Sequence, residues 1–175
     1  MKKLLTLFFF FSLCAVNFAQ TNFKWELTDS TAKTKTQIYA DTKLFIAEAW
    51  NSAKDVIQND DKENGIVLIK GLSKSRITGV WGYSDYYFSY TVQFRMKDGK
   101  YRITLDNVDY DNAITTSTSK PSPLSLDGFQ GAFKDGMTEK NYNKVIEGLK
   151  DNLNTLVLSY QSYMKKPTVA IADNF

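Results

Sequence analysis

Histidine is absent from this chain of 175 residues, and cysteine occurs once, at Cys14. Histidine is the side chain best suited to proton transfer near neutral pH, and it is the commonest metal ligand. Its absence excludes Ser-His and Cys-His nucleophilic sites, and with so little cysteine it also excludes the usual Cys/His zinc sites. An enzyme with this sequence would therefore depend on carboxylates, tyrosine, lysine or arginine. We expect no cofactor.

The sequence also has little net charge. It contains 22 basic and 19 acidic residues, and two of the basic residues, Lys2 and Lys3, lie at the N-terminus. A nucleic-acid-binding domain needs a basic surface that faces the phosphates. The remainder of the chain is close to neutral, so we expect no nucleic-acid partner.

The N-terminal segment has the pattern of a secretory signal peptide. Lys2 and Lys3 form a basic head, Leu4–Val16 is an apolar run, and Ala19 offers a small residue for cleavage. We expect cleavage near Ala19, which would remove residues 1–19. The protein would then be exported, to the periplasm or out of the cell.

Two other interpretations of this segment fit less well. A transmembrane anchor would need about 20 apolar residues, and this run is shorter. A lipoprotein would carry its lipid on Cys14, but Leu13 stands where the acylation signal needs a small side chain. We therefore expect no transmembrane segment once the signal is removed.

The mature chain of about 155 residues is long enough to bury one hydrophobic core without disulfides. We expect one domain over residues 20–166 and a C-terminal tail over 167–175. Within the domain, Phe23–Thr28 alternates apolar and polar residues, which predicts a half-buried strand. The following segment, Gln37–Gln58, repeats its apolar residues at helical spacing and predicts an amphipathic helix.

The next segments predict the start of a sheet. Asn59–Gly65 is charged and ends in glycine, which predicts a turn. The β-branched residues that begin at Ile66 predict a strand to about Ser75. Arg76–Asp85 contains two glycines, so it is interpreted as a loop or an irregular hairpin.

The clearest local pattern is the strict alternation of apolar and polar residues over Tyr86–Lys97. It predicts a strand with one buried face and one solvent-exposed, or wet, face. Asp98-Gly99 then predicts a tight turn, and a return strand begins at Tyr101. The expected buried residues are Tyr86, Phe88, Tyr90, Val92, Phe94, Met96, Tyr101, Ile103 and Leu105. The expected wet residues are Tyr87, Ser89, Thr91, Gln93, Arg95, Lys97, Arg102 and Thr104.

A polar segment, residues 111–136, predicts a long loop that is either mobile or functional. A second helix is predicted from Thr138 or Glu139 to about Met164, where two lysines and Pro167 mark its end. Each helix has one apolar stripe and each strand one apolar face. The predicted fold is therefore α+β, with two helices on one face of an antiparallel sheet and the other face open.

Several short runs in this order resemble a known family. They are Ile38-Tyr39, Ala49-Trp50, Asp61-Lys62-Glu63-Asn64-Gly65, Lys70-Gly71 and Met96-Lys97-Asp98-Gly99-Lys100-Tyr101-Arg102. Together they resemble the family of exported bacterial domains of unknown function 4468, described as having a TBP-like fold, over about residues 37–108. The resemblance implies a curved antiparallel sheet that wraps around two helices. It implies no activity and no site residues, and the name of the fold does not imply DNA binding.

The wet face of the predicted hairpin is the first candidate site. Hydroxyl, amide and guanidinium groups on an open sheet face bind sugars, peptides or anionic groups, and arginine offers paired donors to a carboxylate or phosphate. The simpler interpretation is an ordinary solvated face, which every such sheet has. Trp81, in the glycine-containing loop, is a candidate for stacking on a ligand, whereas Trp25 and Trp50 are expected in the core. The candidate ligand-binding residues are Trp81, Tyr87, Gln93, Arg95 and Arg102.

Two acidic clusters invite a comparison with calcium sites. Asp106, Asp109, Asp111 and Asn112 provide oxygen ligands, but Ala113 stands where a further ligand would fall. A second cluster meets the same objection; it contains Asp60, Asp61 and Glu63. We interpret both as charges at strand ends and expect no metal.

The expected function is a non-catalytic binding or accessory module of the bacterial cell envelope, whose partner is a glycan, a peptide or another envelope protein. The alternative is a carboxylate-dependent hydrolase acting on envelope or extracellular polymers, because that chemistry needs no histidine. An open sheet edge that adds a partner strand is a further way to bind. Lys70, Lys74 and Arg76 are interpreted as charges that could instead protect such an edge.

Overall fold

The computed structural model of the protein describes residues 23–50, 52–79, 82–111, 124–125 and 137–168. The predicted signal peptide with Cys14, the candidate Trp81, Asn112 and most of the predicted loop 111–136 lie outside these residues. The division into a signal peptide, one domain over 20–166 and a tail stays a prediction.

Five antiparallel strands form the body of the sheet, in the order β1-β5-β4-β3-β2. The short strand β6 pairs with the end of β5. Their bounds are β1 Trp25–Ser30, β2 Ile57–Asp61, β3 Ile66–Gly79, β4 Gly82–Lys97, β5 Lys100–Tyr110 and β6 Leu124–Ser125. The first strand of the chain therefore lies beside β5, and the β4–β5 hairpin occupies the centre.

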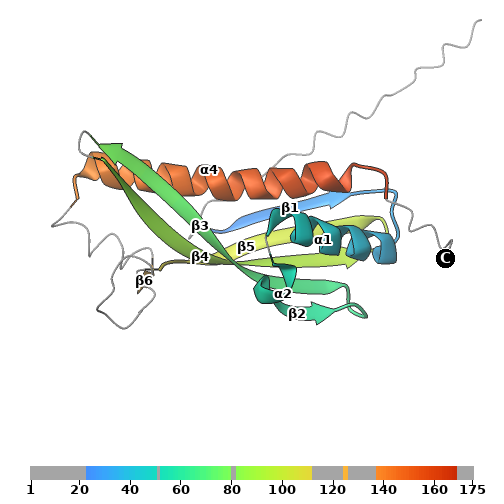
Figure 1. Ribbon diagram of the computed structural model, residues 1–175. Coiled ribbons are helices and arrows are strands. Elements are labelled where there is room, and N and C mark those ends of the chain that lie inside the picture. The colour runs from blue at the N-terminus through green and yellow to red at the C-terminus, as the bar shows by residue number, and fades with distance from the viewer. Residues whose placement is uncertain (1–22, 51, 80–81, 112–123, 126–136, 169–175) are drawn as a thin grey trace, which may run out of the picture.

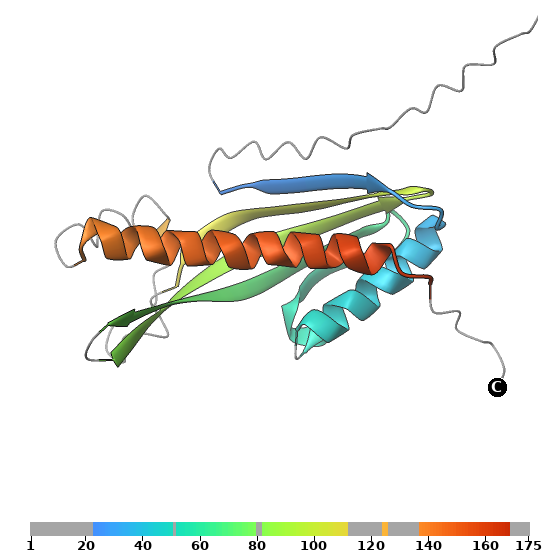
Figure 2. The same ribbon diagram turned by 90° about the horizontal axis from the view of Figure 1, so that it is seen from above.

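Within the described residues, the helices are α1 (Lys35–Ala49), the single turn α2 (Ala53–Val56) and the long α4 (Glu139–Met164). Helices α1 and α4 lie on the same face of the sheet (Figures 1 and 2). Helix α4 packs on β3 and β1, and α1 packs on β4 and α4. In Figure 1 the far ends of β3 and β4 rise toward the start of α4, so the sheet curves around this helix. The predicted α+β fold, a curved antiparallel sheet with two helices on one face, is confirmed.

Capping side chains define where both long helices begin. The hydroxyl of Thr34 accepts from the Gln37 amide, and the Gln37 side chain accepts from the Thr34 amide, which is a capping box. Thr138 caps α4 in the same way by accepting from the amide of Asn141. The second helix therefore begins and ends as the sequence predicts. No helix within the described residues is both long and apolar enough to cross a membrane.

The alternation predicted for β4 and β5 holds over most of its length. The core contains Phe88, Tyr90, Val92, Phe94, Met96, Tyr101, Ile103 and Leu105, and Trp25 joins it, whereas Trp50 and Tyr86 are only partly buried. A bulge at Asn107, with φ of 51°, shifts the register so that Val108 and Tyr110 still face the core. The prediction for Ser89 is wrong, because its side chain is buried and not solvent-exposed. Its small side chain lies between two larger neighbours in register, Leu72 and Asp109.

The helix predicted over Gln37–Gln58 is wrong beyond Ala49. The chain leaves the helix at Trp50, makes the single turn α2 and then forms β2, which pairs with β3 across the turn that ends at Gly65. The apolar residues Val56 and Ile57, which fit a helical stripe, instead pack against the core from this edge. From Ile57 on, the backbone pairs with β3, so a tertiary contact overrides the local helical pattern.

Of the two interpretations of Arg76–Asp85, the loop is wrong and the hairpin holds, with regular pairing in place of irregular structure. Strands β3 and β4 stay paired as far as Gly79 and Gly82. Arg76 and Asp85 face each other in register, and the guanidinium donates to both carboxylate oxygens at 2.6 and 2.8 Å. The same guanidinium lies 3.9 Å from the ring centroid of Tyr83. These cross-strand contacts stabilise a hairpin where the glycines alone predict irregular structure.

Candidate functional site

The strand register places charged residues side by side on the open face of the sheet. Thr28 on β1 pairs with Arg102 on β5, which pairs with Arg95 on β4, which pairs with Ile66 on β3. These four residues form a continuous row across four strands. Because side chains alternate along a strand, the next residues on this face of β4 and β5 are Lys97 and Lys100, which also pair with each other.

A groove of about 550 Å³ lies over these residues. It is lined by Thr28, Asn64, Ile66, Arg95, Met96, Lys97, Lys100, Tyr101 and Arg102. Met96 and Tyr101 belong to the core-facing side of their strands and are almost fully buried. The polar groups that face the groove are therefore cations, a hydroxyl and an amide.

The closed end of the β4–β5 hairpin is held in place by the segment that joins β1 to α1. Gly99, in the turn, has φ of 70°. Its amide donates to the carbonyl of Lys33, and its carbonyl accepts from the amide of Thr31, both at 3.0 Å. Asp98 accepts from the amide of Lys35 at 2.7 Å. The turn is tied to the first residues of α1, so we expect the cations beside it to have a fixed backbone.

The two arginines of the row differ in their partners. The Nε of Arg102 donates to the hydroxyl of Thr28 at 2.9 Å, and its Nη1 lies 3.5 Å from Glu26. Arg95 is exposed, and within the described residues it forms no ion pair or hydrogen bond through its side chain. Like charges directly opposite each other on a sheet are destabilising. The row therefore combines one oriented guanidinium with one that has no partner in the described part of the chain.

The structure brings together two of the five predicted site residues. Arg95 and Arg102 are neighbours, and Gln93 lies in the adjacent row on the same face. Tyr87 is six residues from Gln93 along β4, about 20 Å away. Trp81 lies outside the described residues. Lys100 was not predicted as a site residue, although it lies in the same hairpin, opposite Lys97. Thr28 on β1 and Ile66 on β3 were not predicted either, because only the long-range pairing of their strands with the hairpin brings them to the groove.

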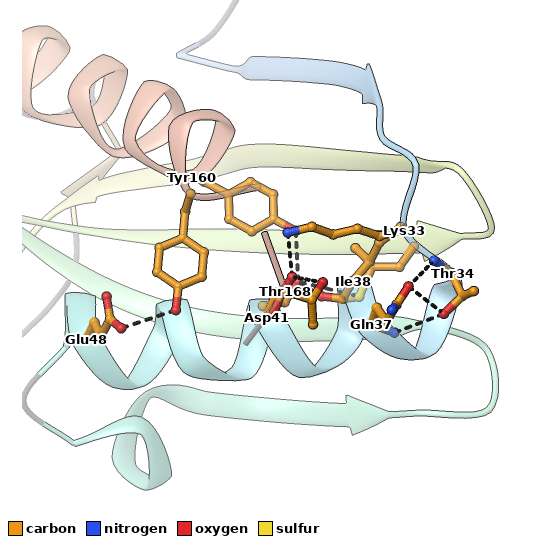
Figure 3. A network of polar contacts seen from close by, with 11 residues as sticks. Lys33, Thr34, Gln37, Ile38, Asp41, Glu48, Tyr160 and Thr168 are labelled. Atoms are coloured by element: carbon orange, nitrogen blue, oxygen red, sulfur yellow. Dashed lines mark hydrogen bonds and ion pairs between the residues drawn. The ribbon is translucent and has the colours of Figure 1, made fainter. Parts of the chain in front are cut away.

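A second cavity, of about 560 Å³, lies at the end of α4. It is lined by Ser30, Thr31, Ala32, Lys33, Gln37, Tyr101, Met164, Lys165, Lys166, Pro167 and Thr168. Figure 3 shows Lys33 reaching Asp41 on α1, where Thr168 contacts the same carboxylate. The ion pair between Lys33 and Asp41 measures 2.6 Å and is almost fully buried. The charge of Lys33 is therefore already neutralised within the fold.

The predicted acidic clusters are placed at strand edges and turns. Asp106 and Asp109 flank the bulge in β5, and Asp60 binds Lys43 and Tyr39 on α1. Within the described residues, no group of three or more acidic residues could hold a metal ion. Because Asp60 lies on β2 and both of its partners lie on α1, its contacts connect this edge strand to the helix.

The stability of the protein should depend on pH only outside the neutral range. Burial raises the pKa of Asp29, but hydrogen bonds from Gln161, the Ser30 amide and Tyr101 outweigh burial and lower it overall. The hydrogen bond from Arg76 lowers the pKa of Asp85. Burial raises the pKa of Tyr90 to about 12. The carboxylates therefore stabilise the fold above about pH 4, and the tyrosine does so below about pH 10.

We expect the free energy of unfolding, measured with urea as a function of pH, to be level between about pH 5 and 9. It should fall as the pH drops through the lowered carboxyl pKa values, because the unfolded state then binds more protons. It should also fall above about pH 10, because unfolded tyrosines ionise first. Without histidine, a step near pH 6 to 7 has no side chain to cause it and would contradict this account.

The family described as "Domain of unknown function (DUF4468) with TBP-like fold" matches residues 16–111. This range contains the groove residues, β1 to β5 and α1, whereas α4 lies beyond it. A comparison with the curated proteins finds no match.

The solved structures that are similar to this one include the following two proteins. A DUF4468 family protein from Bacteroides ovatus ATCC 8483 has a TM-score of 0.60 at 11% identity, over 83% of this chain and 88% of that one. A TBP-like protein from Parabacteroides distasonis ATCC 8503 has a TM-score of 0.58 at 13% identity, over 84% of this chain and 96% of that one. At these identities the likeness shows a shared fold.

Proposed function

Because the chain belongs to the DUF4468 family, whose description assigns no activity, we propose that it is a non-catalytic binding module of the bacterial cell envelope. The observation that carries the proposal is the groove on the open sheet face. It presents four cations, and only Arg102 among them forms an ion pair within the described residues. Arginine and lysine side chains in such a groove recognise carboxylate or phosphate groups.

The envelope part of the proposal comes from the N-terminal sequence. A basic head, an apolar run and a small residue at Ala19 are the features of a signal peptide, so the ligand would be met outside the cytoplasm. Glycans, peptides and other envelope proteins offer the acidic groups that the groove would bind.

The hydrolase alternative needs two carboxylates that face each other across a cleft. Neither the groove nor the second cavity is lined by an aspartate or glutamate. Neither of these two cavities therefore supports a hydrolase.

The proposal predicts that an Arg95→Ala, Arg102→Ala double variant folds normally and loses ligand binding. Both side chains lie on the open face, so without ligand we expect the free energy of unfolding to change by less than about 1 kcal/mol. The measurement is the melting temperature of the mature protein against glycans, peptidoglycan fragments, acidic peptides, lipids and calcium. A ligand at about 100 times its dissociation constant adds roughly 2.7 kcal/mol, which raises the midpoint by several degrees.

A Lys70→Ala, Lys74→Ala variant is the matched control. It removes two cations from the same face of the sheet but from β3, outside the lining of the groove. We expect it to keep the ligand-induced shift that the arginine variant loses. Equal shifts in both variants would place binding elsewhere. A large loss of stability in the arginine variant without ligand would show that these side chains support the fold.

A further inference from the structure

The groove contains two parallel pairs of cations. Arg95 lies opposite Arg102, and Lys97 lies opposite Lys100, on adjacent strands of one hairpin. Facing residues on antiparallel strands are about 5 Å apart. The two pairs are two residues apart along each strand, which corresponds to about 7 Å. The backbone register therefore places the Cα atoms of four cationic residues at the corners of a rectangle.

The charges of this rectangle are largely uncompensated. Within the described ranges, Arg95, Lys97 and Lys100 form no ion pair, and the only acidic partner is Glu26, at 3.5 Å from Arg102. Two like-charged pairs directly opposite each other oppose the pairing of the strands. A ligand that brings negative charge between the members of each pair would remove this repulsion, whereas a neutral ligand would leave it.

The other groups of the groove fit an anionic ligand larger than one carboxylate. Thr28 accepts from the Nε of Arg102 and so orients its guanidinium. Asn64 adds a neutral polar group, and Ile66 adds an apolar wall beside Arg95. A volume of about 550 Å³ leaves room for a linker between two acidic groups.

We propose that the groove binds ligands that carry two carboxylate or phosphate groups about 7 Å apart, one held by Arg95 and Arg102 and the other by Lys97 and Lys100. This inference rests on the proposed function, because it names the ligand chemistry of the same groove. An extended peptide with acidic residues at alternate positions has this spacing, since its side chains repeat at the same interval as those of the strands. A short chain of phosphates offers the same two charges.

The test is calorimetric titration of the protein at low ionic strength, where charge interactions are least screened. One arm uses linear dicarboxylates from succinate to suberate, with acetate as the single-charge reference. The other arm uses tripolyphosphate, with orthophosphate as its reference. We expect at least one arm to bind ten-fold or more tightly than its reference. Among the dicarboxylates, affinity should peak at an intermediate length.

The variants assign the two charges to the two pairs. A Lys97→Gln, Lys100→Gln variant should bind the best doubly charged ligand only as tightly as it binds the singly charged reference. An Arg95→Gln, Arg102→Gln variant should likewise bind the doubly charged ligand no more tightly than its reference. A Lys70→Gln, Lys74→Gln variant should leave the affinity for the doubly charged ligand and for its reference unchanged. Tight binding in only one arm identifies the acidic group as carboxylate or phosphate.

Affinity that is independent of ligand length and charge number in both arms would overturn the inference, as would unchanged binding in the Lys97 and Lys100 variant. The proposed function has a separate outcome. One outcome is that the arginine variant fails to bind an envelope ligand that the unmodified protein binds, while neither titration series shows tighter binding of the doubly charged ligands. In that case the groove is a binding site and only the two-charge inference fails. If the arginine variant loses nothing, the proposed function fails as well.

Discussion

Replacing Tyr160 by alanine should lower the free energy of unfolding by about 3 to 5 kcal/mol, as removal of a buried aromatic ring does. Tyr160 is fully buried on α4. Its ring centroid lies 4.8 Å from that of Phe94, 5.1 Å from that of Phe45 and 5.3 Å from that of Tyr101. The side chain therefore connects α4 to α1 and to both central strands. The measurement is urea unfolding of the purified variant.

The phenylalanine variant separates the ring from its hydroxyl. The hydroxyl of Tyr160 lies 2.8 Å from that of Thr42, which also donates to the carbonyl of Ile38 at 2.7 Å. Tyr160→Phe keeps the ring and leaves Thr42 with a partner, so we expect a cost of only about 1 kcal/mol. An equal cost for both variants would mean that the hydrogen bond, and not the aromatic packing, fixes α4.

Replacing Asp41 by leucine should cost about 3 to 5 kcal/mol, because it leaves the charge of Lys33 without a partner in a buried position. Asp41 is 3% exposed, although it is an aspartate in the middle of a helix. Its carboxylate accepts from Lys33 at 2.6 Å and from Thr168 at 3.2 Å (Figure 3). The carboxylate of Asp41 therefore joins two segments to the middle of α1: the residues just before this helix, through Lys33, and the chain that follows α4, through Thr168.

A double-mutant cycle tests the origin of this cost. Lys33→Met alone should also be strongly destabilising, whereas the double variant with Asp41→Leu should cost much less than the sum of the two single variants. The reason is that an apolar pair of similar size carries no buried charge. Additive costs, measured by urea unfolding, would show that the two side chains do not interact.

The parts of the fold that local sequence predicts are those with a strong period. Tyr86–Lys97 alternates without a break, and Asp98-Gly99 allows only a tight turn, so the central hairpin and its faces follow from the sequence. The long apolar stripe of α4 is equally clear. The errors fall at Ala49, where the helix ends early, and at Arg76–Asp85, where strands continue. In both places pairing with a neighbouring strand decides the structure, and local pattern does not contain this pairing.

The candidate site was predictable to the same extent. The alternation placed Arg95 and Arg102 on the open face, and the structure shows that they are in register. The contributions of Thr28 and Ile66 depend on β1 pairing with β5 and on β3 pairing with β4. The register of β1 with β5 joins segments more than 70 residues apart, which no periodicity reveals. The prediction that Ser89 is solvent-exposed was wrong, because its burial depends on the size of its cross-strand neighbours.

The most direct test of the central claim is a nuclear magnetic resonance titration of the protein with adipate, in which the shifts of backbone amide signals are mapped onto the structure. We predict that the largest shifts occur at Thr28, Arg95, Lys97, Lys100 and Arg102, around the groove, and that they disappear in the Arg95→Gln, Arg102→Gln variant. Shifts that instead gather at Lys165 and Lys166, around the second cavity, would contradict the account, as would shifts scattered over all exposed lysines.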